Sequence, residues 1–282
     1  MKIPKNNKNI FQICIGLDCD HPKVKASRKK MLDANPDYNY IIIKEEAEMD
    51  NFVKDHFLKS KNEEEKKWAE AYFKIPQVVE ALTQTTVLCS KIDVARLMLI
   101  YKFGGLYLDM DSKFYYSLSK ITKQKSCVVF ISDTNHGLKD SQSIDFCPDQ
   151  FYCVKNDPVY KKVISNICLN IFSHIEQGNH KVQQIVGFTG PFVIFNTIKN
   201  ICEENNYSLD YSIKKLGEPC RIHNKVEGAD YTYKGSNFTF FLVRASSRSF
   251  NDILYWNGER EHWNPNIVKG MRDRAAKNKP KQ

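Results

Sequence analysis

One stretch constrains the fold more than any other: residues 90–114, which read SKIDVARLMLIYKFGGLYLDMDSKF. Its residues 92–100 are apolar around nearly the whole circumference of a helix, apart from Asp93 and Arg96. A helix that is apolar on all sides must be covered on all sides. A Gly-Gly pair ends this helix, and a short apolar strand follows at once. A buried helix feeding a buried strand indicates an α/β core of substantial size.

Segments with strand-like and helix-like patterns alternate along the chain, which predicts an α/β fold with a mixed, mostly parallel sheet flanked by helices. No composition shift divides the chain, so we expect one domain over residues 1–265 and a basic tail over 266–282. We expect strands at 9–16, 38–44, 106–109, 126–132 and 239–246, and helices at 21–35, 45–58, 62–74, 77–102, 157–178 and 187–205.

Composition narrows the class of protein. The 282 residues are 42% hydrophobic, which suits a globular domain, and no apolar run approaches the ~20 residues of a membrane span. The start has no signal-peptide pattern, and the nine cysteines are odd in number and scattered, which predicts reduced thiols. We therefore expect a soluble cytoplasmic protein without a transmembrane segment.

The net charge of +9 is concentrated at the C-terminal end, where residues 269–282 carry six Lys or Arg and one Asp. A basic end of this kind is more often a solvated tail than a nucleic-acid contact. No nucleic-acid-binding motif accompanies the charge, so no nucleic-acid partner is expected.

The polar pair on the buried helix has two simple structural explanations. Asp93 and Arg96 are three residues apart and share one helix face, so they can form an internal salt bridge. Ser90 and Asp93 also fit the spacing of a capping box. A third explanation is that both residues face a ligand.

The carboxylates after the strand point to chemistry. Asp109 and Asp111 alternate along an extended segment, so both face the same side, at the point where the strand leaves the sheet. Two like charges this close raise each other's pKa unless a cation lies between them. A divalent metal bound by oxygen ligands removes the conflict and leaves positions for phosphate oxygens.

The array from residue 90 to 111 resembles the pattern S-D-x-x-R-x-x-x-L-x-x-x-G-G-x-Y-x-D-x-D of family 32 glycosyltransferases, the group with a sugar-binding region containing DXD. Initiating mannosyltransferases and capsular polysaccharide enzymes belong to this group. Ile92 departs from the pattern, because the family has Ser there. Weaker similarities span residues 3 to about 263. The opening IPKNNKNIFQICIG is one, with Phe11 and Cys14 where the family has His and Trp. The sequence TGP at 189–191 is another, and Asp149 lies near a usual Asn. In the segment TFFLVRASSRSF, Arg244 replaces His and Phe250 replaces Trp, while Ser249 is kept.

The resemblance implies a GT-A fold and a metal-dependent, retaining glycosyltransferase. Its donor would be a nucleotide sugar, with UDP favoured, and its acceptor a glycan or another hydroxyl. By analogy, Asp93 would accept hydrogen bonds from the donor sugar, and Arg96 would orient Asp93 or donor oxygens. Asp109 would reach the ribose and the metal, and Asp111 would ligate Mn²⁺ or Mg²⁺ directly.

The same resemblance assigns further residues to the donor. Phe11, Gln12 and Ile13 would border the base and ribose. Ser249 would close over the diphosphate, and Arg244 would contact a phosphate or form a salt bridge at the edge of the core. Asp149 and Gln150 fall where relatives contact the sugar or acceptor.

Two other functions are alternatives to this one. A phosphotransferase using Asp-x-Asp has its motif near the N-terminus followed by Thr, whereas here the motif is central and Ser-Lys follows it. The changes at Phe11, Cys14, Arg244 and Phe250 leave open a nucleotide-sugar-binding protein without turnover. The Lys-, Asn- and Ile-rich composition and the lack of a membrane anchor fit a bacterial or large-virus source.

Overall fold

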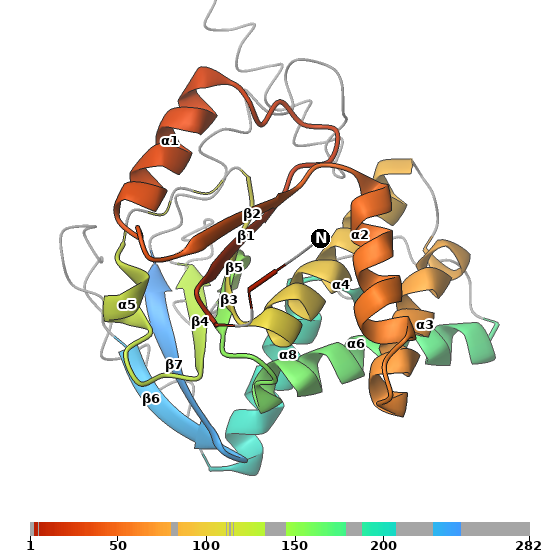
Figure 1. Ribbon diagram of the computed structural model, residues 1–282. Helices are drawn as coiled ribbons and strands as arrows, with labels where there is room; N and C mark the ends of the chain where they lie inside the picture. The colour runs from red at the N-terminus through yellow and green to blue at the C-terminus, as the bar shows by residue number, and fades with distance from the viewer. Residues whose placement is uncertain are drawn as a thin grey trace, which may run out of the picture.

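The computed structural model describes residues 3–4, 6–79, 84–110, 112, 114, 116–132, 145–178, 188–206 and 228–243. These residues form an α/β structure built on one sheet (Figure 1). Its strands are β1 (Asn9–Ile13), β2 (Asn39–Ile43), β3 (Gly105–Leu108), β4 (Cys127–Ser132), β5 (Asp145–Cys153), β6 (Gly228–Tyr233) and β7 (Ser236–Val243). Its helices are α1 (Pro22–Asp33), α2 (Glu46–Val53), the π-helical η1 (Lys54–Leu58), α3 (Glu63–Val78), α4 (Gln84–Phe103), α5 (Leu118–Ile121), α6 (Pro158–Glu176) and α8 (Pro191–Glu204).

The strands form a seven-stranded sheet in the order β2-β1-β3-β5-β4-β7-β6. β1 pairs in parallel with β2 and β3, and β4 pairs in parallel with β7, whereas β5 and β6 run antiparallel to their neighbours. Five strands therefore share one direction and two oppose it. The predicted mixed, mostly parallel α/β sheet, which is the kind expected of a GT-A glycosyltransferase, is confirmed.

Two strands escaped the sequence analysis, and both are the antiparallel ones. β5 has the sequence DFCPDQFYC, in which Pro148 and two acidic residues break the apolar run. β6 has the sequence GADYTY, in which Gly228 and Asp230 interrupt the apolar pattern. The strands that were expected are the apolar, parallel ones, which agrees with the continuous hydrophobic runs of buried parallel strands.

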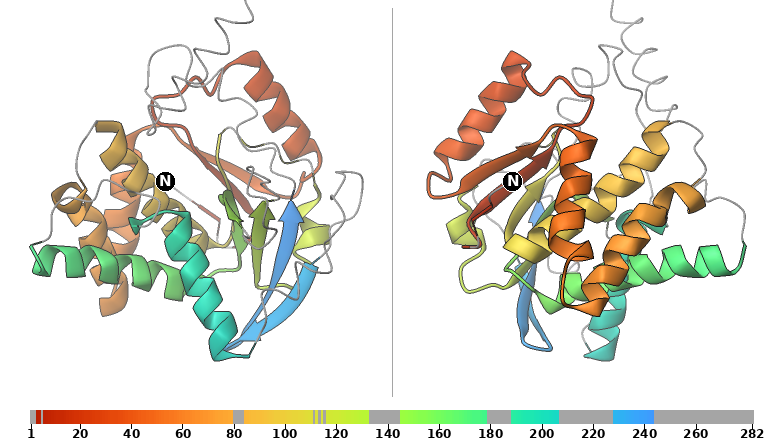
Figure 2. Two further views of the ribbon diagram at one scale, coloured as in Figure 1. Left: turned by 180° about the vertical axis from the view of Figure 1, so that it is seen from behind. Right: turned by 45° about the vertical axis from the view of Figure 1, so that its right-hand side comes forward.

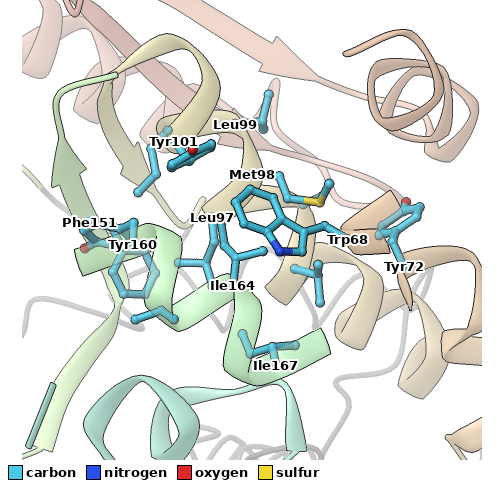
Figure 3. Packing of buried hydrophobic residues seen from close by; sticks show 14 of the residues in the cluster. Trp68, Tyr72, Leu97, Met98, Leu99, Tyr101, Phe151, Tyr160, Ile164 and Ile167 are labelled. Atoms are coloured by element: carbon cyan, nitrogen blue, oxygen red, sulfur yellow. The ribbon is translucent and has the colours of Figure 1, made fainter. Parts of the chain in front are cut away.

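The main core lies on one face of the sheet, where α3, α4 and α6 converge (Figure 3). Trp68, Leu97, Met98, Tyr160 and Ile164 are each at most 2% exposed there. Figure 2 shows α2, α3 and α4 side by side, with α6 crossing them and leading to α8. A smaller apolar cluster covers the opposite face, under α1 and α5. Buried side chains on every side of α4 confirm the prediction of a helix inside the core.

Two glycines fix the step from α4 into β3. Gly104 has a φ of +69° and Gly105 a φ of +124°, backbone angles that residues other than glycine rarely adopt. A Cβ on Gly104 would lie 2.0 Å from Asn7 Oδ1, and one on Gly105 would lie 2.2 Å from the Asn9 carbonyl oxygen. The pair therefore lets β3 start against β1 immediately after the helix ends.

Two further expectations can be compared with the described part of the chain. None of its helices combines the length and apolar character that a membrane span requires. Among its cysteines, Cys14, Cys19, Cys127, Cys153, Cys168 and Cys202 are buried and form no disulfide, as expected for reduced thiols. The predicted basic tail, residues 266–282, lies outside the described residues.

Candidate active site

The site begins on the last three turns of α4. Residues 94–100 of this helix are fully buried, and Asp93 and Arg96 form its polar ridge. Arg96 Nη2 lies 2.5 Å from Asp93 Oδ1, and the two side chains are 5% and 15% exposed. The internal salt bridge considered from the sequence is therefore present. It does not stand alone, because Arg96 also contacts a carboxylate from the next strand.

Arg96 joins α4 to the carboxyl end of β3. Its Nη1 lies 3.4 Å from Asp109 Oδ1. Its guanidinium carbon lies 5.7 Å from the ring centre of Tyr107 and 5.3 Å from that of Phe151. An arginine held between two carboxylates and two aromatic faces has little freedom to turn. The side chain is therefore fixed before any ligand arrives.

Asp109 is the first residue after β3, where parallel strands present side chains to a ligand. The Tyr107 hydroxyl donates a hydrogen bond to Asp109 Oδ1 at 2.7 Å, and Tyr107 itself is 1% exposed. Burial and the neighbouring Asp109 raise the pKa of Tyr107 well above its ordinary value, so the hydroxyl remains a donor. Arg96 and Tyr107 both contact Oδ1 of Asp109, and neither of these two contacts involves Oδ2.

Among the described residues, the balance of charge at the site is negative. Burial raises the pKa of Asp93 to about 6, with Arg96 opposing the shift and Asp109 adding to it. Burial alone would lower the pKa of Arg96, but Asp93, Asp109 and Asp149 outweigh it, so the pKa rises. Three carboxylates thus face one guanidinium. This leaves a net negative charge, which a bound cation would offset.

Asp149 and Gln150 occupy opposite faces of the sheet. Both lie on β5, where successive side chains alternate, and Asp149 is on the side that interacts with Arg96. Gln150 is paired with Leu108, which belongs to the smaller core cluster on the other face. Gln150 is fully buried, and its amide has no hydrogen-bond partner in the described part of the chain. Of the two residues, only Asp149 lies on the side of the carboxylates.

The residues expected to border the base and ribose lie on β1, next to β3. Phe11 and Ile13 are 0% and 4% exposed and belong to the main core, where the Phe11 ring lies 6.5 Å from that of Phe103. Both side chains are therefore part of the core packing. Cys14 is also buried, so two of the departures from the family pattern are packing positions.

The side chain of Gln12, unlike those of Phe11 and Ile13, forms hydrogen bonds. Its Nε2 donates to the backbone carbonyl of Asp109 at 3.3 Å, and its Oε1 accepts from the Tyr40 hydroxyl at 2.7 Å. Arg28 on α1 donates to the same hydroxyl at 3.3 Å. This chain of hydrogen bonds braces the turn that carries Asp109.

Three predicted site residues, Asp111, Arg244 and Ser249, lie outside the described residues. Within the described ranges no cluster of three or more His, Cys, Asp or Glu is arranged to hold a metal. Asp109 still offers the hard carboxylate oxygen that Mn²⁺ or Mg²⁺ prefers, in surroundings of net negative charge. These surroundings fit a divalent cation at the Asp109 carboxylate.

Sequence reasoning gave no role to two residues that the structure brings into the site. Tyr107 was visible, because it lies two positions before Asp109 on the same strand face. Thr189 donates a hydrogen bond from its hydroxyl to Asp93 Oδ2 at 3.2 Å, across 96 positions of sequence. No local sequence pattern predicts a contact between residues so far apart in the sequence.

Part of the chain matches a known protein family. Residues 22–129 match the family model described as the glycosyltransferase sugar-binding region containing the DXD motif. This stretch of the chain is similar to glycosyltransferase sugar-binding regions. The match confirms the family predicted from the sequence and the predicted class of enzyme, a nucleotide-sugar-dependent glycosyltransferase. The sugar-binding region contains Asp93, Arg96, Tyr107 and Asp109, and it ends within β4.

Solved structures and curated proteins were compared as well. A structure titled PaToxG glycosyltransferase is 18% identical, with a TM-score of 0.47, over 74% of this chain and 73% of that one. The UDP-bound glycosyltransferase domain from the YGT toxin is 11% identical, with a TM-score of 0.39, over 95% of this chain and 77% of that one. No curated protein sequence matches the chain.

Proposed function

We propose that the chain is a metal-dependent, retaining glycosyltransferase of the GT-A type. It moves a sugar from a nucleotide-sugar donor to a hydroxyl of a glycan or another acceptor. The observation that supports this most is the placement of Asp93, Arg96 and Asp109 together at the carboxyl end of β3, inside a sugar-binding region. The family resemblance favours a UDP-linked donor, and a cytoplasmic location of bacterial or large-virus origin remains our prediction.

Each residue has a distinct part in this proposal. Asp93 accepts hydrogen bonds from hydroxyls of the donor sugar, and Arg96 fixes Asp93 and Asp109 relative to each other. Asp109 and Asp111 hold Mn²⁺ or Mg²⁺. When bound, such an ion supplies positive charge opposite the diphosphate leaving group. Arg244 and Ser249 are proposed to contact the diphosphate from the C-terminal part of the chain.

The surroundings of Asp93 favour retention without a covalent intermediate. A carboxylate nucleophile needs an oxygen that is free to attack the sugar. Arg96 occupies one oxygen of Asp93 and Thr189 the other. We therefore propose that the acceptor hydroxyl attacks from the face that the leaving group departs from, with Asp93 orienting the sugar.

The first experiment measures stabilisation by donors. Purified protein is titrated with UDP-glucose, UDP-galactose, UDP-GlcNAc and GDP-mannose, with Mn²⁺ or with EDTA, and thermal unfolding is followed. A donor at 100 times its dissociation constant stabilises by ~2.7 kcal/mol, which is a clear shift in Tm. We expect one donor to stabilise the protein with Mn²⁺ only, and Asp111→Asn to abolish the effect. Asp33→Asn, an exposed carboxylate on α1, is the control that should retain it.

Donor hydrolysis and transfer are then measured with the stabilising donor. Turnover supports the enzyme, and stabilisation without turnover favours the binding protein considered from the sequence. Failure of every nucleotide sugar to stabilise the protein in the presence of metal would contradict the proposed function.

A further inference from the structure

Thr189 lies immediately before α8, and its side chain is buried against the site. It is 0% exposed, and its hydroxyl donates to Asp93 Oδ2 at 3.2 Å. Gly190 caps the helix, and Pro191 is its first residue. Phe188, on the other side of Thr189, is 4% exposed, and its ring lies 4.9 Å from that of His174 on α6. Thr189 is therefore held between a helix start and a packed ring.

We infer that Thr189 is a positioning residue that fixes the Asp93 carboxylate in the orientation that meets the donor sugar. The inference rests on the proposed function and deepens it, because it makes sugar recognition depend on a residue beyond the matched segment 22–129. Thr189 itself touches neither the sugar nor the metal. It acts through Asp93.

The geometry at Asp93 requires a second donor for a fixed orientation. One hydrogen bond leaves a carboxylate able to rotate about its final torsion, which is soft for Asp. Arg96 Nη2 binds Oδ1 at 2.5 Å, and the Thr189 hydroxyl binds Oδ2 from a different element. The two donors approach different oxygens from α4 and from the start of α8. Together they set both the position and the plane of the carboxylate.

The contacts of the other site residues predict which part of the donor is bound less tightly when Thr189 is replaced. Arg96 remains bound to Asp109 and stacked near Tyr107 without Thr189. Asp109 remains bound by the Tyr107 hydroxyl. The side proposed to bind metal and diphosphate is therefore left in place. Only the carboxylate proposed to meet sugar hydroxyls loses a partner.

The test compares affinities for the nucleotide sugar and for its nucleoside diphosphate. Wild type, Thr189→Val and Thr189→Ser are titrated calorimetrically with UDP-glucose and with UDP in Mn²⁺, and with the other nucleotide sugars and GDP if UDP-glucose does not bind. A charge-assisted hydrogen bond accounts for about a tenfold change in affinity or more. We expect Thr189→Val to lose about tenfold in affinity for the nucleotide sugar and to keep its affinity for the diphosphate. Thr189→Ser, which keeps the hydroxyl, should behave as wild type.

Thr197→Val is the matched control. Thr197 is a buried threonine of α8, 2% exposed, and its hydroxyl accepts from Asn166 Nδ2 at 2.9 Å. Its replacement removes a buried hydroxyl from the helix that follows Thr189, without touching Asp93. We expect both affinities to stay at the wild-type values. If Thr189→Val does not fold, the comparison of Thr189→Ser with Thr189→Ala asks the same question with smaller side chains.

The outcomes separate the inference from the proposed function. Equal losses for nucleotide sugar and diphosphate, or no loss in Thr189→Val, would overturn the role of Thr189 while wild-type binding still supported the function. A wild-type protein that binds diphosphates but no nucleotide sugar would refute both. Loss for the sugar alone, restored by serine, supports the inference.

Discussion

At the scale of single residues, Arg96 organises the site. A buried cation is costly unless it is paired, and breaking such a pair leaves an uncompensated charge. Here one guanidinium serves Asp93 and Asp109 and rests against two aromatic faces. The pair of carboxylates is thus held apart by the group that neutralises part of their charge. The residual negative charge is what we expect a metal ion to meet.

Two tyrosines around Phe151 allow a matched test of that arrangement. Tyr107 donates to Asp109, whereas the Tyr160 hydroxyl is buried with no partner among the described residues. Tyr107→Phe should lower the free energy of unfolding by about 1.5–3 kcal/mol, the value of a hydrogen bond to a charged group. Tyr160→Phe should be neutral or stabilising, because it removes an unsatisfied buried group. Urea unfolding of both variants checks this, and equal destabilisation would contradict the role given to Tyr107.

The pKa of Asp93 predicts a dependence of donor binding on pH. Burial raises this pKa to about 6, so the carboxylate is protonated as the pH falls through that value. A protonated Asp93 can no longer accept through both oxygens, so affinity for the nucleotide sugar should fall below pH 6, by about tenfold per pH unit at the steepest. Calorimetry from about pH 5 to about pH 7, roughly one pH unit on either side of the transition, checks this. Asp93→Asn should bind weakly and lack this transition; a transition that persists in the variant would assign it to another group.

At the scale of elements, the junction of α4 and β3 carries the site. The helix places Asp93 and Arg96, the strand places Tyr107 and Asp109, and two glycines set the angle between them. The chain also braces this junction from β1, through the hydrogen bond of Gln12 to the Asp109 carbonyl. The contacts of Arg96 with Asp109 and Tyr107 therefore depend on one tight turn.

The turn can be tested with a matched pair of glycine substitutions. Gly105→Ala adds a Cβ that meets the Asn9 carbonyl at a φ of +124°, so backbone strain and overpacking add. We expect it to cost about 3 kcal/mol or more in unfolding free energy. Gly235→Ala has a φ of +88° but nothing within 4 Å of the new Cβ, so it should cost only about 1 kcal/mol. Similar urea midpoints for the two variants would contradict the close approach of β3 to β1.

At the scale of the whole molecule, the matched region is not a structural unit. It contributes β3 and β4, which in the sheet are separated by β5 from the following segment. The main core beneath α4 is closed by α6 and α8. Asp157 at the start of α6 accepts from Ser236 at the start of β7 at 2.8 Å, which ties the late strands to the same core. The site is thus assembled by elements from both halves of the chain.

A fragment of residues 1–132 tests this dependence. It keeps the sugar-binding region but lacks β5, so β4 has no strand to join it to β3. We expect no cooperative thermal or urea transition by circular dichroism, because one face of α4 is left without cover. The full chain is the control. A sharp two-state transition of the fragment would show that the region folds alone.

The sequence by itself determined the buried helix α4, the Gly-Gly turn, the apolar strand before Asp109 and the α/β class. These are features of local periodicity and backbone sterics, which a short window of residues contains. It also placed Asp93, Arg96 and Asp109 in one site, because a helix face and a strand end were adjacent in the chain.

Only the tertiary structure decided the rest. The insertion of β5 between β3 and β4, the hydrogen bond from Thr189 to Asp93 and the commitment of Phe11 and Ile13 to the core join residues far apart in sequence. The same is true of the separation of Asp149 from Gln150 by the two faces of a strand whose pairing was not foreseen. Such contacts arise from how packed elements meet. Their residues show no pattern until the fold brings them together.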